Sequence, residues 1–123
     1  MLGKQTLVAF VASTDSERAR RFYEETLGLQ LMSDDPFAFV FNANGVTIRV
    51  QKVPAFQAQP FTALGWTVED INAVVARLKE RGVSCERYAG MDQDARGIWA
   101  SPSGARIAWF KDPDGNVLSL TEF

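Results

Sequence analysis

Histidine is absent from this sequence of 123 residues, and cysteine occurs once. Without an imidazole there is no Ser-His or Cys-His nucleophile, so acid–base catalysis at neutral pH would need an Asp, Glu, Lys, Cys or Tyr with a perturbed pKa. One cysteine also excludes a disulfide framework. We expect Cys85 to be a reduced, inert thiol in a strand at residues 84–88.

Strong net charge and long apolar runs are also missing. The chain has 13 basic and 15 acidic side chains, a formal charge of -2, so no basic surface for nucleic acid is indicated. No apolar run approaches the length of about 18 residues needed to cross a bilayer, and residues 1–5 do not resemble a signal peptide. We therefore expect a soluble, cytoplasmic protein with neither membrane nor nucleic acid as a partner. Its 46% hydrophobic content is typical of a single folded domain.

What the sequence does contain is an internal repeat. Asp15 is followed by Gly28 and Asp70 by Gly82, and each pair encloses an amphipathic segment that predicts a helix. Each half then contains a turn dipeptide between apolar segments, Asn44-Gly45 in the first and Asp114-Gly115 in the second. The repeat predicts an α+β fold of two modules, residues 5–53 and 61–123, joined by a proline-containing linker at 54–60, all within one domain.

The first helix should begin at a capping box of Thr14 and Glu17 and end at Gly28. The second should begin near Asp70. Apolar segments predict strands at residues 7–12, 29–32, 37–41, 46–53 and 61–68. An insertion at residues 90–104 delays the second hairpin; its part 91–97 is interpreted either as a mobile lid over a ligand or as an idle surface loop.

Strand periodicity assigns side chains to two faces of each sheet. One parity is apolar throughout and should lie beneath the helices; it contains Leu7, Ala9, Val11, Ile48, Val50, Leu64, Trp66, Val68, Leu118 and Leu120. The other parity mixes polar and apolar residues and should form the concave face. If both hairpins have two-residue loops, Val40 lies opposite Arg49 and Phe110 lies opposite Ser119 on that concave face. Phe39 and Trp109 then belong to the core.

The segments 10–29 and 110–116 together resemble a known family. The first has the pattern Asp…Ala…Phe-Tyr…Leu-Gly and the second reads Phe-Lys-Asp-Pro-Asp-Gly-Asn. Both are similar to the vicinal oxygen chelate superfamily, which includes glyoxalase I, bleomycin-resistance proteins and extradiol dioxygenases. The resemblance implies two βαβββ modules in a pseudo-twofold arrangement, a curved mixed sheet around a cleft, and commonly a homodimer.

The resemblance also implies where a divalent metal would be held. In metal-dependent members, His and Glu ligands occupy positions that correspond here to Val8, Arg49, Ala63 and Ser119. None of the four is His, Glu or Asp, and a cation at Arg49 would repel a metal ion. We therefore expect no metal site and no cofactor. The acidic segment Asp112-Pro113-Asp114-Gly115 is interpreted as a tight turn rather than as paired catalytic acids.

What remains is a cleft with one cation. Candidate ligand-binding residues are Val8, Phe10, Val40, Arg49, Gln51, Ala63, Thr67, Phe110, Ser119 and Thr121. Arg49 in apolar surroundings favours a carboxylate, enolate or phosphate ligand, but it could instead pair with an acid of residues 92–94 or of a second subunit.

Three functions follow from this cleft. The first hypothesis is metal-independent binding of a small, partly apolar, anionic or oxygen-rich molecule. The alternative is a lyase or dioxygenase-type enzyme with a non-standard site, in which Arg49 stabilises an enolate-like state. A structural or regulatory protein that shares only the fold is the third.

Overall fold

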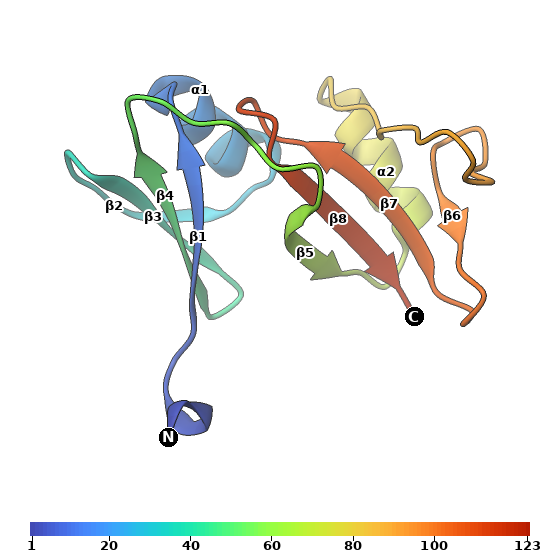
Figure 1. Ribbon diagram of the computed structural model, residues 1–123, viewed down its shortest axis with the longest axis horizontal. Coiled ribbons are helices and arrows are strands. Elements are labelled where there is room, and N and C mark those ends of the chain that lie inside the picture. The colour runs from blue at the N-terminus through green and yellow to red at the C-terminus, as the bar shows by residue number, and fades with distance from the viewer. The chain divides into compact units, whose positions relative to one another are not determined.

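The computed structural model describes residues 1–123 and divides into two compact units, Met1–Gln57 and Ala58–Phe123. Each unit contains a four-stranded mixed sheet and one main helical segment (Figure 1). The division between the units falls inside residues 54–60. The predicted α+β fold of two repeated modules is thereby confirmed, and each unit is described below by itself.

The first unit has the strand order β1-β4-β3-β2, with β1 parallel to β4 and the other neighbours antiparallel. Its elements are η1 (Leu2–Lys4), β1 (Val8–Ser13), α1 (Ser16–Arg21), the π-helical turn η2 (Phe22–Thr26), β2 (Gln30–Asp34), β3 (Ala38–Ala43) and β4 (Val46–Lys52). The parallel pair β1 and β4 requires a crossover, and α1 with η2 supplies the start of it.

Helix α1 begins one residue later than the expected capping box. Asp15, not Thr14, is the N-cap, and its carboxylate accepts a hydrogen bond of 3.3 Å from the N–H of Arg18. The side chains of Ala19, Phe22 and Tyr23 are buried. The helix turns into η2 after Arg21, where Phe22 and Tyr23 are buried, and the ring centroid of Tyr23 lies 5.8 Å from that of Phe41.

The core of the first unit lies between this helical segment and one face of the sheet. It consists of Val11, Ala19, Phe22, Tyr23, Phe39, Phe41, Ile48 and Val50. The strand residues among them have the apolar parity predicted from the sequence, with Phe39 in the core as expected. Ala9 of that parity is only half-buried, and Leu7, which precedes β1, is 73% exposed. Asn44 and Gly45 both have positive φ, 49° and 91°, as a two-residue hairpin loop requires.

The second unit has the strand order β5-β8-β7-β6, again with one parallel pair, β5 and β8. Its elements are β5 (Thr62–Thr67), α2 (Ile71–Glu80), β6 (Trp99–Ala100), β7 (Arg106–Lys111) and β8 (Val117–Glu122). Helix α2 packs against β7 and β8 through Ile71, Val75 and Leu78, all buried. No helix in the structure is both long enough and apolar enough to cross a membrane.

The start of α2 is fixed by two carboxylates from different elements. Asp70 is the N-cap, as predicted, and accepts from the N–H of Ala73 at 3.1 Å. Glu122, from the end of β8, accepts from the N–H of Ile71 at 2.9 Å and pairs with Arg106 at 3.7 Å. Glu122 therefore lies on the helix-covered face and has a structural partner there.

Two local predictions in the second unit are wrong. Residues 84–88 form no strand; the segment is irregular and makes one backbone bond to β7, from the N–H of Glu86 to the carbonyl of Trp109 at 2.7 Å. The second hairpin also has a longer loop than the predicted two residues. The N–H of Asp112 donates to the carbonyl of Asn116, which leaves the three residues Pro113, Asp114 and Gly115 in the loop.

Candidate functional site

The open face of the first sheet carries a cation in an apolar row. Arg49, in the centre of β4, pairs with Phe10 on β1 and with Val40 on β3, as the sequence predicted for Val40. Paired residues of neighbouring strands share a face, so the guanidinium is flanked on both sides by apolar side chains. Phe10 is 52% exposed and Val8, two residues earlier on the same face, is 38% exposed. Gln51 extends this face toward the end of β4.

The guanidinium group of Arg49 forms no hydrogen bond and no ion pair with a side chain of the first unit. Arg49 acts electrostatically on Asp35, whose pKa is lowered first by the backbone N–H groups of Phe37 and Ala38 and to a smaller degree by Arg49. The other cation of this strand, Lys52, is already engaged with Asp34 at 2.6 Å. Arg49 is therefore the cation of β4 that is available to an anion from outside.

Asp94, one of the acids named as a possible partner of Arg49, is engaged within its own loop. It accepts hydrogen bonds from the N–H groups of Arg96 and Ile98, at 2.9 and 3.0 Å. Burial opposes ionisation of Asp94, but these two donors and the nearby guanidinium groups lower its pKa. The carboxylate of Asp94 thus stabilises its own loop through hydrogen bonds to the backbone, as is typical of a short turn that contains aspartate.

The open face of the second sheet is formed by two rows of paired residues. Gly65, Ser119 and Trp109 form one row across β5, β8 and β7. Thr67, Thr121, Ile107 and Trp99 form the next, which continues to β6. The predicted site residues Ser119, Thr121 and Thr67 thus do share one face. Ala63 lies in an irregularity of β5 between Thr62 and Leu64, where the register with β8 shifts.

Phe110 does not belong to this open face, contrary to the prediction. It pairs with Leu118 on the helix-covered side and is 1% exposed, so it is a core residue. Trp109, predicted to be in the core, pairs with Ser119 and takes the place expected for Phe110. The cause is the three-residue loop, because a shift of one residue in register exchanges the two faces of a strand.

An aromatic cluster that the sequence did not reveal covers the outer part of this open face. The ring of Trp109 lies 5.6 Å from Tyr88, edge to face, and 6.2 Å from Trp99. Tyr88 is 36% exposed, and burial raises the pKa of its hydroxyl. One sequence feature could have located Trp109. Pro113 has no N–H, so it cannot form the donor side of a two-residue hairpin at Asp114-Gly115.

The four positions implied for a metal do not suit a divalent cation. The side chains of Val8 and Ala63 have no ligand atom, Arg49 is a cation, and Ser119, a buried residue, offers one hydroxyl. Gly65 stands so close that a Cβ added there would meet the Ser119 Oγ at 2.7 Å. No group of three or more His, Cys, Asp or Glu side chains in the structure is arranged to hold a metal ion.

The ten predicted site residues therefore divide between the units. Five lie on the open face of the first sheet, four lie along the second sheet, and one is buried in the core. The first group is Val8, Phe10, Val40, Arg49 and Gln51; the second is Ala63, Thr67, Ser119 and Thr121. Trp99, Trp109 and Tyr88 are added by the structure.

Solved structures of the same fold include proteins of differing description. A member of the glyoxalase/bleomycin resistance protein/dioxygenase superfamily from Sphaerobacter thermophilus is 24% identical, with a TM-score of 0.77 and full coverage of both chains. TnmS3, an antibiotic binding protein from Streptomyces, is 27% identical, with a TM-score of 0.73 and coverage of 99% of this chain and 98% of that one. A lactoylglutathione lyase from Agrobacterium tumefaciens is 15% identical, with a TM-score of 0.75 and coverage of 97% and 93%.

Among curated protein sequences, no significant match was found. Residues 6–120 match the model of the Glyoxalase/Bleomycin resistance protein/Dioxygenase superfamily, which is nearly the whole chain. The match includes both halves of the repeat and both hairpins. The chain therefore belongs to the Glyoxalase/Bleomycin resistance protein/Dioxygenase superfamily.

Proposed function

We propose that this protein binds a small, partly apolar, anionic or oxygen-rich molecule without a metal ion. The observation that carries the proposal is the unpaired Arg49 in a row between Phe10 and Val40. A guanidinium can form two parallel hydrogen bonds to a carboxylate or phosphate, and such bonds are stronger where apolar neighbours exclude water. The same neighbours would contact the apolar part of the ligand.

The open face of the second sheet supports an aromatic or ring-containing ligand. Trp109, Trp99 and Tyr88 present three rings, and flat apolar surfaces of this kind stack with aromatic ligands. Thr67 and Thr121 add hydroxyl groups along the next row. The description of TnmS3 as an antibiotic binding protein supports the same class of function, since that chain is similar to this one along its whole length.

Metal independence is part of the proposal and rests on donor chemistry. Divalent ions in proteins are held by carboxylate, imidazole or thiolate groups, and the four family positions provide none of these. Arg49 adds a positive charge at one of these four positions, which disfavours a divalent cation there. An anion is the complementary ligand for that position.

A thermal-shift screen tests the proposal. Purified protein is heated with small aromatic acids, aliphatic acids and glycopeptide-type antibiotics, in parallel with EDTA and with divalent metals. We expect at least one anionic compound to raise the melting temperature equally with and without EDTA. Stabilisation that requires a metal would overturn metal independence and favour the enzymatic alternative.

The role of Arg49 is tested with a matched pair of variants. Arg49→Gln should weaken binding of the compound by about tenfold, which corresponds to about 1.4 kcal/mol. Arg21→Gln, a change of the same chemistry at an exposed position of α1, should leave binding unchanged. Unchanged affinity of Arg49→Gln would contradict the assigned site.

The expected homodimer stays a prediction, which sedimentation velocity of the same samples would check.

A further inference from the structure

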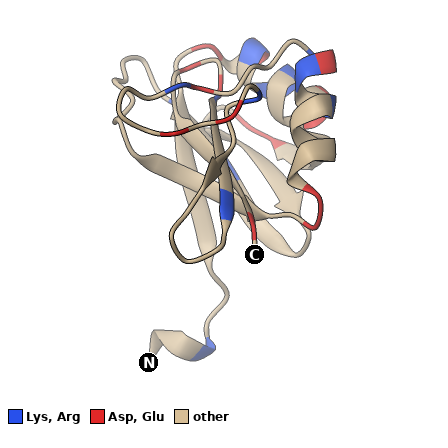
Figure 2. Ribbon diagram, turned by 90° about the vertical axis from the view of Figure 1, so that its right-hand side faces the viewer, with Lys and Arg blue, Asp and Glu red and all other residues tan.

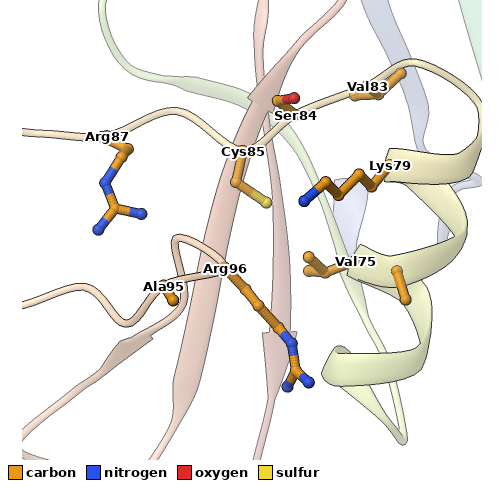
Figure 3. A pocket seen from close by; sticks show the side chains of 9 residues that line it. Val75, Lys79, Val83, Ser84, Cys85, Arg87, Ala95 and Arg96 are labelled. Atoms are coloured by element: carbon orange, nitrogen blue, oxygen red, sulfur yellow. The ribbon is translucent and has the colours of Figure 1, made fainter.

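A cavity lies in the second unit, beside α2, and its lining contains none of the residues proposed above. It has a volume of about 310 Å³, close to the lower end of the range for small-molecule pockets. Three separate segments form it: α2 contributes Val75 and Lys79, the chain after α2 contributes Cys85 and Arg87, and the inserted loop contributes Arg96 (Figure 3). The residues of the open face, including Ser119 and Trp109, are not part of its lining.

The charge of the lining has one sign. Lys79, Arg87 and Arg96 are its charged side chains, and no carboxylate belongs to it. Most charged segments of the protein lie on helices and loops, while the strands carry few (Figure 2). In this pocket the cations instead border apolar surface from Val75 and Val83. Such a combination is suited to an organic anion.

The three cations also lack ion-pair partners. Arg96 donates to the amide oxygen of Asn72 at 2.9 Å, and Arg87 donates to the backbone carbonyl of Gln93 at 3.2 Å. Both acceptors are neutral. Lys79 is exposed, and its ammonium group forms no hydrogen bond or ion pair. Its ammonium group points toward the sulfur of Cys85 in Figure 3.

Two carboxylates near the pocket are already engaged. Glu86 pairs with Lys111 at 3.4 Å, and Asp94 accepts backbone hydrogen bonds within the inserted loop. Arg96 acts electrostatically on Asp94, so part of its charge is compensated there. Burial raises the pKa of the Cys85 thiol, and Asp94 and Glu86 raise it further. Lys79 and Arg87 therefore carry most of the charge available to a ligand.

The walls of the pocket are held in place before any ligand binds. The side chain of Gln93 accepts from the N–H of Tyr88 at 2.8 Å and donates to the carbonyls of Glu86 and Gly97 at 2.9 and 2.8 Å. It thereby joins the segment after α2 to the inserted loop. Gly97 has a φ of 92°, and a Cβ there would meet the Cβ of Cys85 at 2.7 Å. Preorganisation of this kind lowers the entropic cost of binding.

We propose that this pocket is a second ligand site and binds a phosphate monoester of a small apolar alcohol. Three cations around one small cavity suit a group that carries close to two negative charges at neutral pH. The apolar side chains from α2 and from Val83 would contact the organic part. The inserted loop, which the sequence left open as a lid or an idle loop, is on this account one wall of the site.

Phenyl phosphate is the probe, with inorganic phosphate, benzoate and phenol as comparison compounds. Binding is measured by the phosphorus NMR signal of the probe, or by calorimetry for benzoate and phenol. The location is measured through Cys85, the only cysteine, by its rate of alkylation with iodoacetamide above neutral pH. With the probe at about ten times its dissociation constant, alkylation should slow about tenfold. Inorganic phosphate should bind more weakly, and phenol should not bind.

Lys79→Gln should weaken binding of phenyl phosphate about tenfold, or about 1.4 kcal/mol. The variant should fold normally because Lys79 is exposed and glutamine is a good helix former. Arg77→Gln, on the same helix but outside the lining, is the matched control and should bind normally. Absence of binding, binding without protection of Cys85, or an unaffected Lys79→Gln variant would each overturn the proposal. Equal binding of benzoate would overturn the assignment to a phosphate monoester.

Discussion

The two hairpins of the repeat look alike in sequence and differ by one loop residue in structure. Asn44-Gly45 forms a two-residue loop, so Val40 pairs with Arg49. The second loop contains Pro113, Asp114 and Gly115, so Ser119 pairs with Trp109. That single residue decides which aromatic side chain of β7 enters the core and which lies on the open face. Equivalent positions of the sequence repeat therefore do not always lie on the same face of the sheet in the two modules.

The largest expected effect tests this exchange of faces. Phe110→Ala should lower the free energy of unfolding by about 3 to 5 kcal/mol, because it empties a fully buried position beneath α2. Trp109→Ala should cost about 2 kcal/mol or less, since its ring is partly exposed and loses mainly its aromatic neighbours. Urea denaturation measures both. If Trp109→Ala lost more free energy of unfolding than Phe110→Ala, the register would be contradicted and a two-residue loop favoured.

A smaller effect is expected at the two residues that stand three positions before the loop glycines, Asn42 before Gly45 and Asp112 before Gly115. Asp112 is buried and accepts from the N–H groups of Asp114 and Asn116, at 3.0 and 2.9 Å. Its replacement by Ala should cost about 1 to 3 kcal/mol, because donors are left unsatisfied in a buried place. Asn42 accepts from the N–H of Gly45 at 2.8 Å in a more exposed setting, so Asn42→Ala should cost about 1 kcal/mol or less. If urea denaturation showed that the two variants lose the same free energy of unfolding, burial of Asp112 would not be the cause of its larger expected effect.

The loop glycines should behave alike despite the different loops. Gly45 and Gly115 have φ values of 91° and 88°, and neither would suffer a steric clash on addition of a Cβ. Gly45→Ala and Gly115→Ala should therefore each cost about 1 to 2 kcal/mol through backbone strain alone. Gly3→Ala is the control, since Gly3 has open space and no positive φ. A thermal melt that separated the two loop variants widely would indicate a further constraint at one of them.

The smallest change in the free energy of unfolding is expected when the pH is lowered. The pKa of Asp35 is lowered from 3.8 by the N–H groups of Phe37 and Ala38. The pKa of Asp94 is also lowered, although burial opposes its ionisation, by the N–H groups of Ile98 and Arg96 and by nearby cations. A carboxylate with a lowered folded-state pKa stabilises the fold above its unfolded pKa, and this contribution is lost as the pH falls through the folded value.

Stability should therefore decline below about pH 4, and Asp35→Asn and Asp94→Asn should each flatten the decline. Urea midpoints measured between pH 2.5 and pH 6 give the slopes, with unmodified protein as the reference. A variant whose slope matched that of the unmodified protein would show that its aspartate does not contribute to the acid sensitivity.

Much of the fold could be predicted from the sequence because it depends on local chemistry. Asp70 caps α2 and Gly28 ends the first helical segment with a φ of 75°, as the repeat indicated. The period of two along β1 and β4 located the core face of the first sheet, and Arg49 was found on the opposite face. These features depend on neighbours a few residues away, so a sequence contains the information needed.

The remaining features depend on contacts between distant segments. The partners of Glu122 are Ile71 and Arg106, and the irregular course of residues 84–88 follows from hydrogen bonds to Gln93 in the inserted loop. The pocket beside α2 combines residues from α2, from the chain that follows it and from the inserted loop. No periodicity connects such segments, so neither the pocket nor the aromatic cluster was predicted.

The sequence by itself therefore determined the two-module α+β fold, the helix ends and the position of Arg49 on an open face. Tertiary structure alone decided that Trp109 rather than Phe110 faces outward, and that Lys79, Arg87 and Arg96 surround one cavity. The physical reason is the range of the interactions. Caps, turns and strand alternation act over a few residues, whereas register and cavity walls depend on how separated segments pack and hydrogen-bond.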